Sequence, residues 1–209
     1  MARRLDPIAL SKPFVFAACL LPLAWLVWLT AYGDLGPDPV ARLEHETGAW
    51  ALRLLLATLA LTPLRRLGVG AGVIRYRRML GLFAFFYASV HLTVYLVVDL
   101  GGFWSQILQE IARKPFVTAG FVAWLLMIPL AVTSTRAMMR RLGGRWQKLH
   151  RLIYPLAILA VLHFVWQVKY GETIAVREPL IYAGILAVLL AFRVPDWLRR
   201  ARRSGAQQQ

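Results

Sequence analysis

The sequence predicts an all-α membrane protein in which six transmembrane helices form one domain over residues 1–209. Hydrophobic residues make up 59% of the chain, and they gather in six runs separated by short polar segments. The cationic residues lie almost entirely between these runs. An ordinary soluble domain has neither this composition nor this segmentation, whereas a bundle of spanning helices requires both.

The six runs are close to the length that a bilayer requires, which is about 20 apolar residues. They lie at about residues 14–32, 49–64, 79–98, 116–133, 149–168 and 179–193. The second run contains Arg53, and the sixth is short. We still expect both to cross the membrane, because without them the basic and acidic connecting segments would no longer fall on opposite sides of the membrane. Loops are short and no internal repeat is evident, so we expect a single domain with a disordered tail at about 204–209.

The charges between the runs predict the orientation. With both termini in the cytoplasm, nearly all cations fall on the cytoplasmic side and nearly all acids on the other, as the positive-inside rule requires. The cations expected outside are Arg42, Arg113, Lys114, Lys169 and Arg177. The net charge of +15 therefore reflects membrane topology and lipid contact. We expect no nucleic acid partner.

Several chemistries are excluded by what the chain contains. Cys19 is the single cysteine and lies in the first run, so a disulfide framework, an iron–sulfur ligand set and a zinc site have no basis in the sequence. The glycines at 68, 70 and 72 do not have the spacing of a dinucleotide fingerprint, and no strand precedes them. We therefore expect no nucleotide-binding domain.

Two of the four histidines, His91 and His163, lie inside apolar runs. Lipid offers no hydrogen-bond partners to an imidazole, so a histidine within a span indicates a functional site. The third and fifth runs point in the same direction, and each histidine lies about 12 to 14 residues into its run, in the outer half of the bilayer. Two imidazoles at one depth suit axial ligation of a single low-spin haem. The alternative is a structural role within the bundle.

A third histidine, His150, lies near the cytoplasmic boundary. It could ligate a second haem, assist a flavin or quinone, or remain solvated among the headgroups. The corresponding depth on the third run holds Arg77 and Arg78, which cannot bind iron but suit a propionate, a flavin phosphate or a quinone carbonyl. The alternative for both arginines is lipid anchoring and topology.

Arg53 and His45 are the remaining candidates near the outer face. Arg53 is the one charge firmly inside a run, and a haem propionate is a plausible counter-ion. Extension of its side chain to the outer headgroups is the alternative. His45 belongs to the acidic segment 33–48, which we expect to be an exposed outer loop or a docking surface for a partner.

The chain resembles the MsrQ (YedZ) family of haem-binding membrane subunits over nearly its whole length. The resemblance rests on RRMLGLFAFFYASVHLTVYLVVD at Arg77 to Asp99, on the segment from Thr118 to Lys169, and within it on WQKLHRLIYP, whose histidine precedes the HF pair at His163 by thirteen residues. The broader layout is similar to the transmembrane domain of ferric reductases and NADPH oxidases.

This resemblance implies a haem b electron-transfer subunit of the bacterial inner membrane. Electrons would come from the quinone pool or a cytoplasmic flavin reductase, with FMN as a second cofactor. They would pass to MsrP, a periplasmic molybdenum-dependent reductase that repairs methionine sulfoxide and carries the catalytic step. His91, His150 and His163 match the family's haem histidines. Arg77 and Arg78 stand where NADPH oxidases have a fourth histidine, which leaves open whether one or two haems bind.

Two other functions fit the residues. One is a stand-alone quinol-oxidising cytochrome b or ferric reductase with a different acceptor. The other is a transporter or assembly factor without redox chemistry, in which the histidines are structural. An optical spectrum separates the last from the others, because only haem gives a Soret band that sharpens on reduction.

Overall fold

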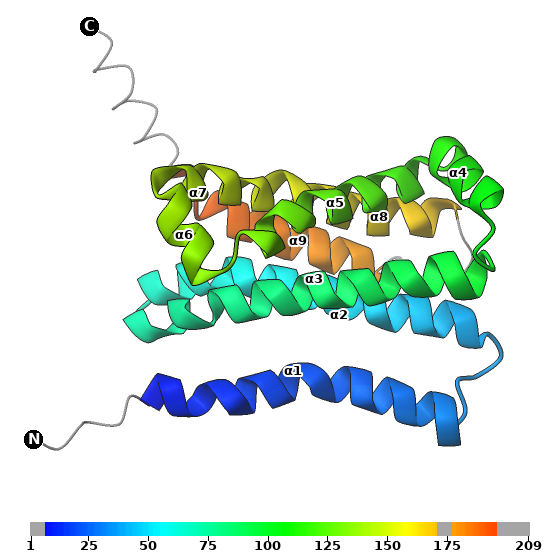
Figure 1. The fold of residues 1–209 in the computed structure, drawn as a ribbon, viewed down its shortest axis with the longest axis horizontal. Helices are drawn as coiled ribbons and strands as arrows, with labels where there is room; N and C mark the ends of the chain where they lie inside the picture. Colours follow the sequence, from blue (N-terminus) through cyan, green and yellow to red (C-terminus); the bar gives the residue numbers. More distant parts are fainter. Residues whose placement is uncertain (1–6, 171–176, 196–209) are drawn as a thin grey trace, which may run out of the picture.

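The computed structural model describes residues 7–170 and 177–195, and the described residues form a bundle of long helices with short helices at its two ends (Figure 1). The predicted tail at 204–209 and most of the predicted outer segment 169–178 lie outside these residues. The helix α1 lies along one edge of the bundle. It begins at the same end of the bundle at which α9 finishes (Figure 1).

The helical elements follow one another closely along the chain. In order they are α1 (Pro7–Tyr32), α2 (Pro39–Arg66), the 3-10 helix η1 (Ala71–Tyr76), α3 (Arg77–Thr93), the π-helix η2 (Val94–Asp99), α4 (Trp104–Arg113), α5 (Pro115–Val132), α6 (Arg136–Leu142), α7 (Gly144–Leu149), the 3-10 helix η3 (His150–Leu152), α8 (Ile153–Tyr170) and α9 (Arg177–Ala191).

Five segments of the described chain are long and apolar enough to cross a membrane. They are Pro7–Tyr32, Pro39–Arg66, Ala71–Asp99, Pro115–Val132 and Gly144–Gln167. They coincide with the first five predicted runs. The sixth run forms α9, which has 15 residues and packs against α8 and α2. The protein is therefore an all-helical protein with several membrane-spanning helices.

The second helix is longer than the sequence predicted, because α2 begins at Pro39 and not near residue 49. The side chain of Asp38 accepts a hydrogen bond from the Ala41 amide at 3.0 Å. Proline at the first helical position needs no amide partner there. His45 consequently lies on the first turns of a helix and not in an outer loop.

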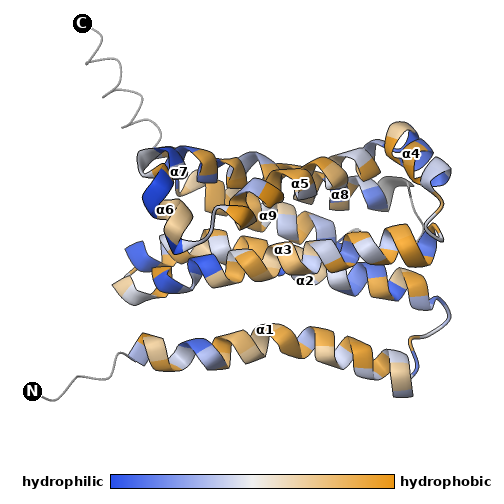
Figure 2. Ribbon diagram, viewed as in Figure 1, coloured by the Kyte–Doolittle hydropathy of each residue, from blue (hydrophilic) through white to orange (hydrophobic). Residues whose placement is uncertain are grey.

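Short helices occupy connections that the sequence analysis treated as loops. The helix α4 forms at one end of the bundle, and α6 with α7 at the other (Figure 1). Ile107 of α4 is buried, and α4 packs against α5. We name these the α4 end and the α6–α7 end. Figure 2 shows hydrophobic residues along the middle of the long helices and hydrophilic residues mainly toward the ends.

The central helices α2, α3, α5 and α8 hold the core. Leu59, Ala84 and Ala157 are completely buried where these helices meet. Large apolar side chains of α1, in contrast, point away from the bundle, and Phe14 is 76% exposed. A bilayer would cover these side chains.

Tyr87 links α1 to this core. Its hydroxyl donates to the Cys19 carbonyl at 2.8 Å and accepts from the Leu23 amide at 3.1 Å. In an undisturbed helix these two backbone groups bond to each other. Pro22 lies between them, inside α1. The buried phenol therefore satisfies backbone groups beside a proline, where helices commonly bend.

We expect Tyr87→Phe to lower the free energy of unfolding by about 1–2 kcal/mol, because both backbone groups lose their partner in an apolar setting. Thermal unfolding of the detergent-solubilised chain measures this. Tyr32→Phe makes the same chemical change at a side chain that is 81% exposed and serves as the control. Equal melting temperatures for the two variants would show that the Tyr87 hydroxyl contributes nothing.

Candidate functional site

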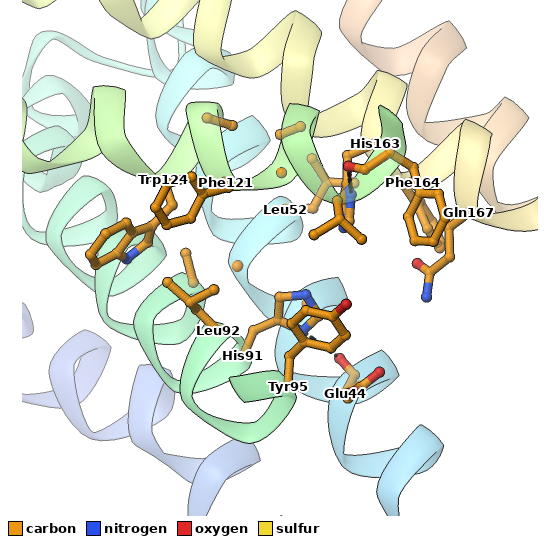
Figure 3. A pocket seen from close by; sticks show the side chains of 18 of the residues that line it. Glu44, Leu52, His91, Leu92, Tyr95, Phe121, Trp124, His163, Phe164 and Gln167 are labelled. Carbon is orange, nitrogen blue, oxygen red and sulfur yellow. Dashed lines mark hydrogen bonds between the residues drawn. The ribbon is translucent and has the colours of Figure 1, made fainter. Parts of the chain in front are cut away.

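A cavity of about 370 Å³ lies between α2, α3, α5 and α8 toward the α4 end. Most of its wall is apolar, and the polar side chains on it include those of His91, His163, Glu44 and Gln167 (Figure 3). Small residues border it on all four helices, among them Gly48, Ala88, Gly120 and Ala160. A ligand pocket in proteins has this size and this character, with a small number of polar groups that fix orientation.

His91 and His163 face each other across this cavity (Figure 3). Their ring centroids are 6.2 Å apart, and the ring planes make an angle of 69°. The spacing along the two apolar runs predicted the two side chains at one depth, and the fold brings them together. His91 comes from the last turn of α3 and His163 from the middle of α8.

Each imidazole is held by a backbone carbonyl of a neighbouring helix. The distance from Nδ1 of His91 to the Glu44 carbonyl is 2.9 Å, and that from Nδ1 of His163 to the Phe116 carbonyl is 2.7 Å. A carbonyl only accepts, so each Nδ1 must carry the proton. The other nitrogen, Nε2, is then the one with a free lone pair, which is the tautomer that binds metals.

The spacing of the two rings fits one metal ion bound between them. With metal–nitrogen bonds of about 2.0–2.1 Å, two imidazoles on opposite sides of an ion have ring centroids about 6 Å apart. Within the described part of the chain, no group of three or more histidine, cysteine, aspartate or glutamate side chains is arranged to hold a metal. The pair therefore suits a metal that brings its remaining ligands with it, as a macrocycle does.

His150 lies apart from the cavity, at the α6–α7 end. Its ring stacks on Trp146 with centroids 3.8 Å apart, and its Nδ1 is 3.1 Å from the Trp146 carbonyl. Arg77 is close enough to interact electrostatically with His150. Arg78 is exposed and borders a separate groove beside Lys12. The structure thus groups His150 with Arg77 but not with Arg78.

Arg53 points away from the cavity. Its Nε donates to the Tyr182 hydroxyl at 2.9 Å, and its guanidinium lies 5.0 Å from the centre of the Trp50 ring. Among the described residues that border the cavity, Lys114 is the only lysine or arginine. The Lys114 ammonium is 2.5 Å from Glu110, whose carboxylate also accepts from Tyr95. Lys114, and not Arg53, is therefore the basic side chain on the wall of this cavity.

His45 borders the same cavity and is half-buried, whereas the sequence analysis expected it to be exposed. Its Nε2 lies 3.4 Å from Glu178, and its ring centroid is 6.1 Å from that of Phe164. The early start of α2 explains the difference, because it turns this position toward α8 and α9.

Arg193 is a buried residue that the sequence analysis placed only among the cytoplasmic cations. It is 5% exposed and donates to the Leu59 carbonyl at 2.8 Å and to the Tyr154 hydroxyl at 2.7 Å. Leu59 lies four residues before Pro63, which has no amide hydrogen to offer that carbonyl. The guanidinium supplies the missing donor. The sequence offered one signal for this contact: a proline inside an apolar run leaves a carbonyl without a donor, and an arginine that follows a later run can supply that donor.

The fold and the paired imidazoles define a class of protein, namely multi-pass helical membrane proteins with facing histidines in the bundle core. Residues 47–161 match the family described as "Ferric reductase like transmembrane component". That segment covers more than half of the chain and contains both His91 and His150. None of the solved structures compared gives a significant match.

Relatives of similar length share about half of the residues. A "Protein-methionine-sulfoxide reductase heme-binding subunit MsrQ" from Xanthomonas euvesicatoria pv. vesicatoria is 55% identical over 100% of this chain and 96% of its own. The proteins of that name from Xanthomonas axonopodis pv. citri and Rhodospirillum rubrum are 57% identical over 93% of this chain and 90% of the relative, and 49% identical over 96% and 94%. The chain belongs to the MsrQ family within the ferric reductase-like transmembrane proteins.

Proposed function

We propose that this chain is a haem b electron-transfer subunit of the bacterial inner membrane. The observation that carries this proposal is the pair of imidazoles, 6.2 Å apart, with both Nδ1 atoms bonded to backbone carbonyls. The name of the relatives, which describes them as heme-binding subunits, supports this proposal. His91 and His163 would hold the haem, which would supply a one-electron centre when bound.

The chain's own residues provide three things toward that group. His91 and His163 would hold it, and the carbonyls of Glu44 and Phe116 keep the ligating nitrogens deprotonated. Apolar side chains around the cavity keep water away, which limits the charge reorganisation that electron transfer requires. Lys114, which pairs with Glu110, offers a cation on the cavity wall.

We further propose six spans with both termini in the cytoplasm, so that α9 is the sixth span. The start of α1 and the finish of α9 at one end of the bundle support this (Figure 1). Basic side chains of α6 and α7 lie at the same end. By the positive-inside rule this α6–α7 end is cytoplasmic and the α4 end periplasmic.

Electrons would enter at the α6–α7 end and leave at the α4 end. The half-buried Arg77 beside His150 suits a quinone carbonyl or the phosphate of FMN. The cavity with the histidine pair lies toward the opposite end, so the flow runs outward. The acceptor would be MsrP, the periplasmic reductase of methionine sulfoxide, and the relatives' name as a subunit of such a reductase supports an associated partner.

The direct test of this function is reduction of the purified chain by a quinol or by a reduced flavin, followed by mixing with MsrP. We expect a low-spin b-type spectrum that sharpens on reduction and is reoxidised by MsrP in the presence of methionine sulfoxide. A purified, folded chain without a Soret band would exclude the proposal. A reduced haem that MsrP leaves unchanged would exclude this acceptor.

The acidic residues near the α4 end should set the rate at which the partner arrives. We expect the combined variant Asp34→Asn, Asp38→Asn and Glu46→Gln to slow reoxidation by MsrP several-fold at low salt, since charges at a docking surface act mainly on encounter. Asn preserves the acceptor oxygens that bond to the Gly36 and Ala41 amides. Stopped-flow measurement over a range of ionic strength tests this, and the effect should fade as salt rises. Rates equal to wild type at every salt concentration would refute it.

A further inference from the structure

The cavity is built from two copies of one arrangement. The helix pair α2 and α3 supplies one half, and the pair α5 and α8 supplies the other. Residues 72 positions apart line it from the two sides, among them Gly48 with Gly120, Ala88 with Ala160, and His91 with His163. In both pairs the first helix runs from the α4 end to the α6–α7 end and the second helix runs back (Figure 1). Few residues are identical between the copies, which is why the sequence shows no repeat.

Each copy holds its imidazole by the same two contacts. The carbonyl that meets Nδ1 belongs to a residue 47 positions before the histidine in both copies. One helical turn after that carbonyl comes a glycine, Gly48 in α2 and Gly120 in α5. The duplication of both contacts indicates that they serve the histidine.

The rings lie directly against the two glycines, so a Cβ atom would collide with the ring at Gly120 and would be in tight contact with it at Gly48. A Cβ atom at Gly120 would be 2.8 Å from Nδ1 and 3.0 Å from Cε1 of His163. A Cβ atom at Gly48 would be 3.2 Å from the same two atoms of His91. Glycine inside a helix is less favourable than alanine, so its presence at these two sites calls for a reason.

We infer that Gly48 and Gly120 are positioning residues that seat the imidazoles of His91 and His163. By allowing each ring to rest on the helix backbone, they let Nδ1 reach the carbonyl one turn away and direct Nε2 into the cavity. They also set the 69° angle between the ring planes. This inference rests on the proposed haem site, and it names residues that determine the geometry of that site.

Two other glycines in the helices serve as matched controls. At Gly81 of α3 the nearest atom to a Cβ would be Cγ2 of Thr58 at 3.8 Å, an ordinary contact. At Gly184 of α9 nothing lies within 4 Å. Alanine at either position changes the helix without touching an imidazole, and we expect it to be tolerated or mildly stabilising.

The first test compares Gly120→Ala, Gly48→Ala and Gly81→Ala in the full-length chain purified with haem. We expect Gly120→Ala to weaken haem binding by roughly 10- to 100-fold, the range for losing the support of a ligating histidine. The low-field EPR line of the ferric protein should also move, since it depends on the angle between the two axial ring planes. Gly48→Ala should act in the same direction but less, and Gly81→Ala should not. Wild-type haem affinity and EPR in Gly120→Ala would overturn the inference.

The second test removes the ring instead of the glycine and reads thermal unfolding of the full chain. We expect Gly120→Ala to lower the melting temperature when His163 is present, and to leave it unchanged or raise it in the His163→Ala background. An equal loss in both backgrounds would mean that Gly120 serves helix packing, and the inference would fall. If His163→Ala retained the complete haem spectrum, the assignment of His163 as a haem ligand would fail, while this comparison would still decide whether the glycine and the ring are in contact.

Discussion

His163→Ala is expected to remove most of the low-spin b-type spectrum, and His91→Ala is expected to do the same. Each imidazole would supply one ligand from its side of the cavity, and each is held by a carbonyl on a separate helix pair. Loss of either side chain would remove one of the two residues that would hold the haem, so the haem should become high-spin or dissociate. The Soret and α bands of the purified variants, with the haem-to-protein ratio, measure this effect.

His45→Ala is the matched control, because His45 borders the same cavity but lies 3.4 Å from Glu178. We expect its spectrum to remain low-spin. Wild-type spectra in both His91→Ala and His163→Ala would contradict the assignment of the pair. A loss in His45→Ala as large as that in His163→Ala would indicate that His45 is itself a ligand.

Arg77→Gln and His150→Ala should slow reduction of the haem by quinol or reduced flavin, while most of the haem content is retained. A charge-assisted hydrogen bond to a carbonyl or phosphate oxygen contributes about 1.5–3 kcal/mol. Its loss should therefore weaken the binding of the quinol or flavin by roughly 10- to 100-fold. Both residues lie at the α6–α7 end, away from the histidine pair. Pre-steady-state reduction over a range of donor concentrations measures the change.

Arg78→Gln is the control for this experiment, since Arg78 carries the same charge at the same end but is exposed beside a separate groove. We expect the haem of the Arg78→Gln variant to be reduced at the wild-type rate. Parallel losses of haem and of rate in His150→Ala would instead assign His150 to ligation of a second haem. Full-rate reduction in both Arg77→Gln and His150→Ala would remove the donor site from this end.

The run lengths and the spacing of residues along them were sufficient to predict that His91 and His163 share a depth, because a helix converts residue number directly into height. The same arithmetic placed His150 about 20 Å from His163 along the chain, at the other end of the bundle. It could not tell which way Arg53 points. Rotation about the helix axis depends on the partners that a side chain finds, and here Tyr182 of α9 is that partner.

The sequence by itself determined the helical membrane class, the presence and order of the first five apolar helices and membership of the MsrQ family. Hydrophobicity and charge order act locally, residue by residue, and need no knowledge of neighbouring helices. Only the tertiary structure decided which groups meet. The carbonyls that hold the imidazoles, the glycines beneath the rings and the buried Arg193 each depend on contacts between segments far apart in the chain. Every residue type carries the same backbone carbonyl, and a glycine differs only in lacking a side chain. The sequence therefore does not indicate which carbonyl or which glycine will contact an imidazole.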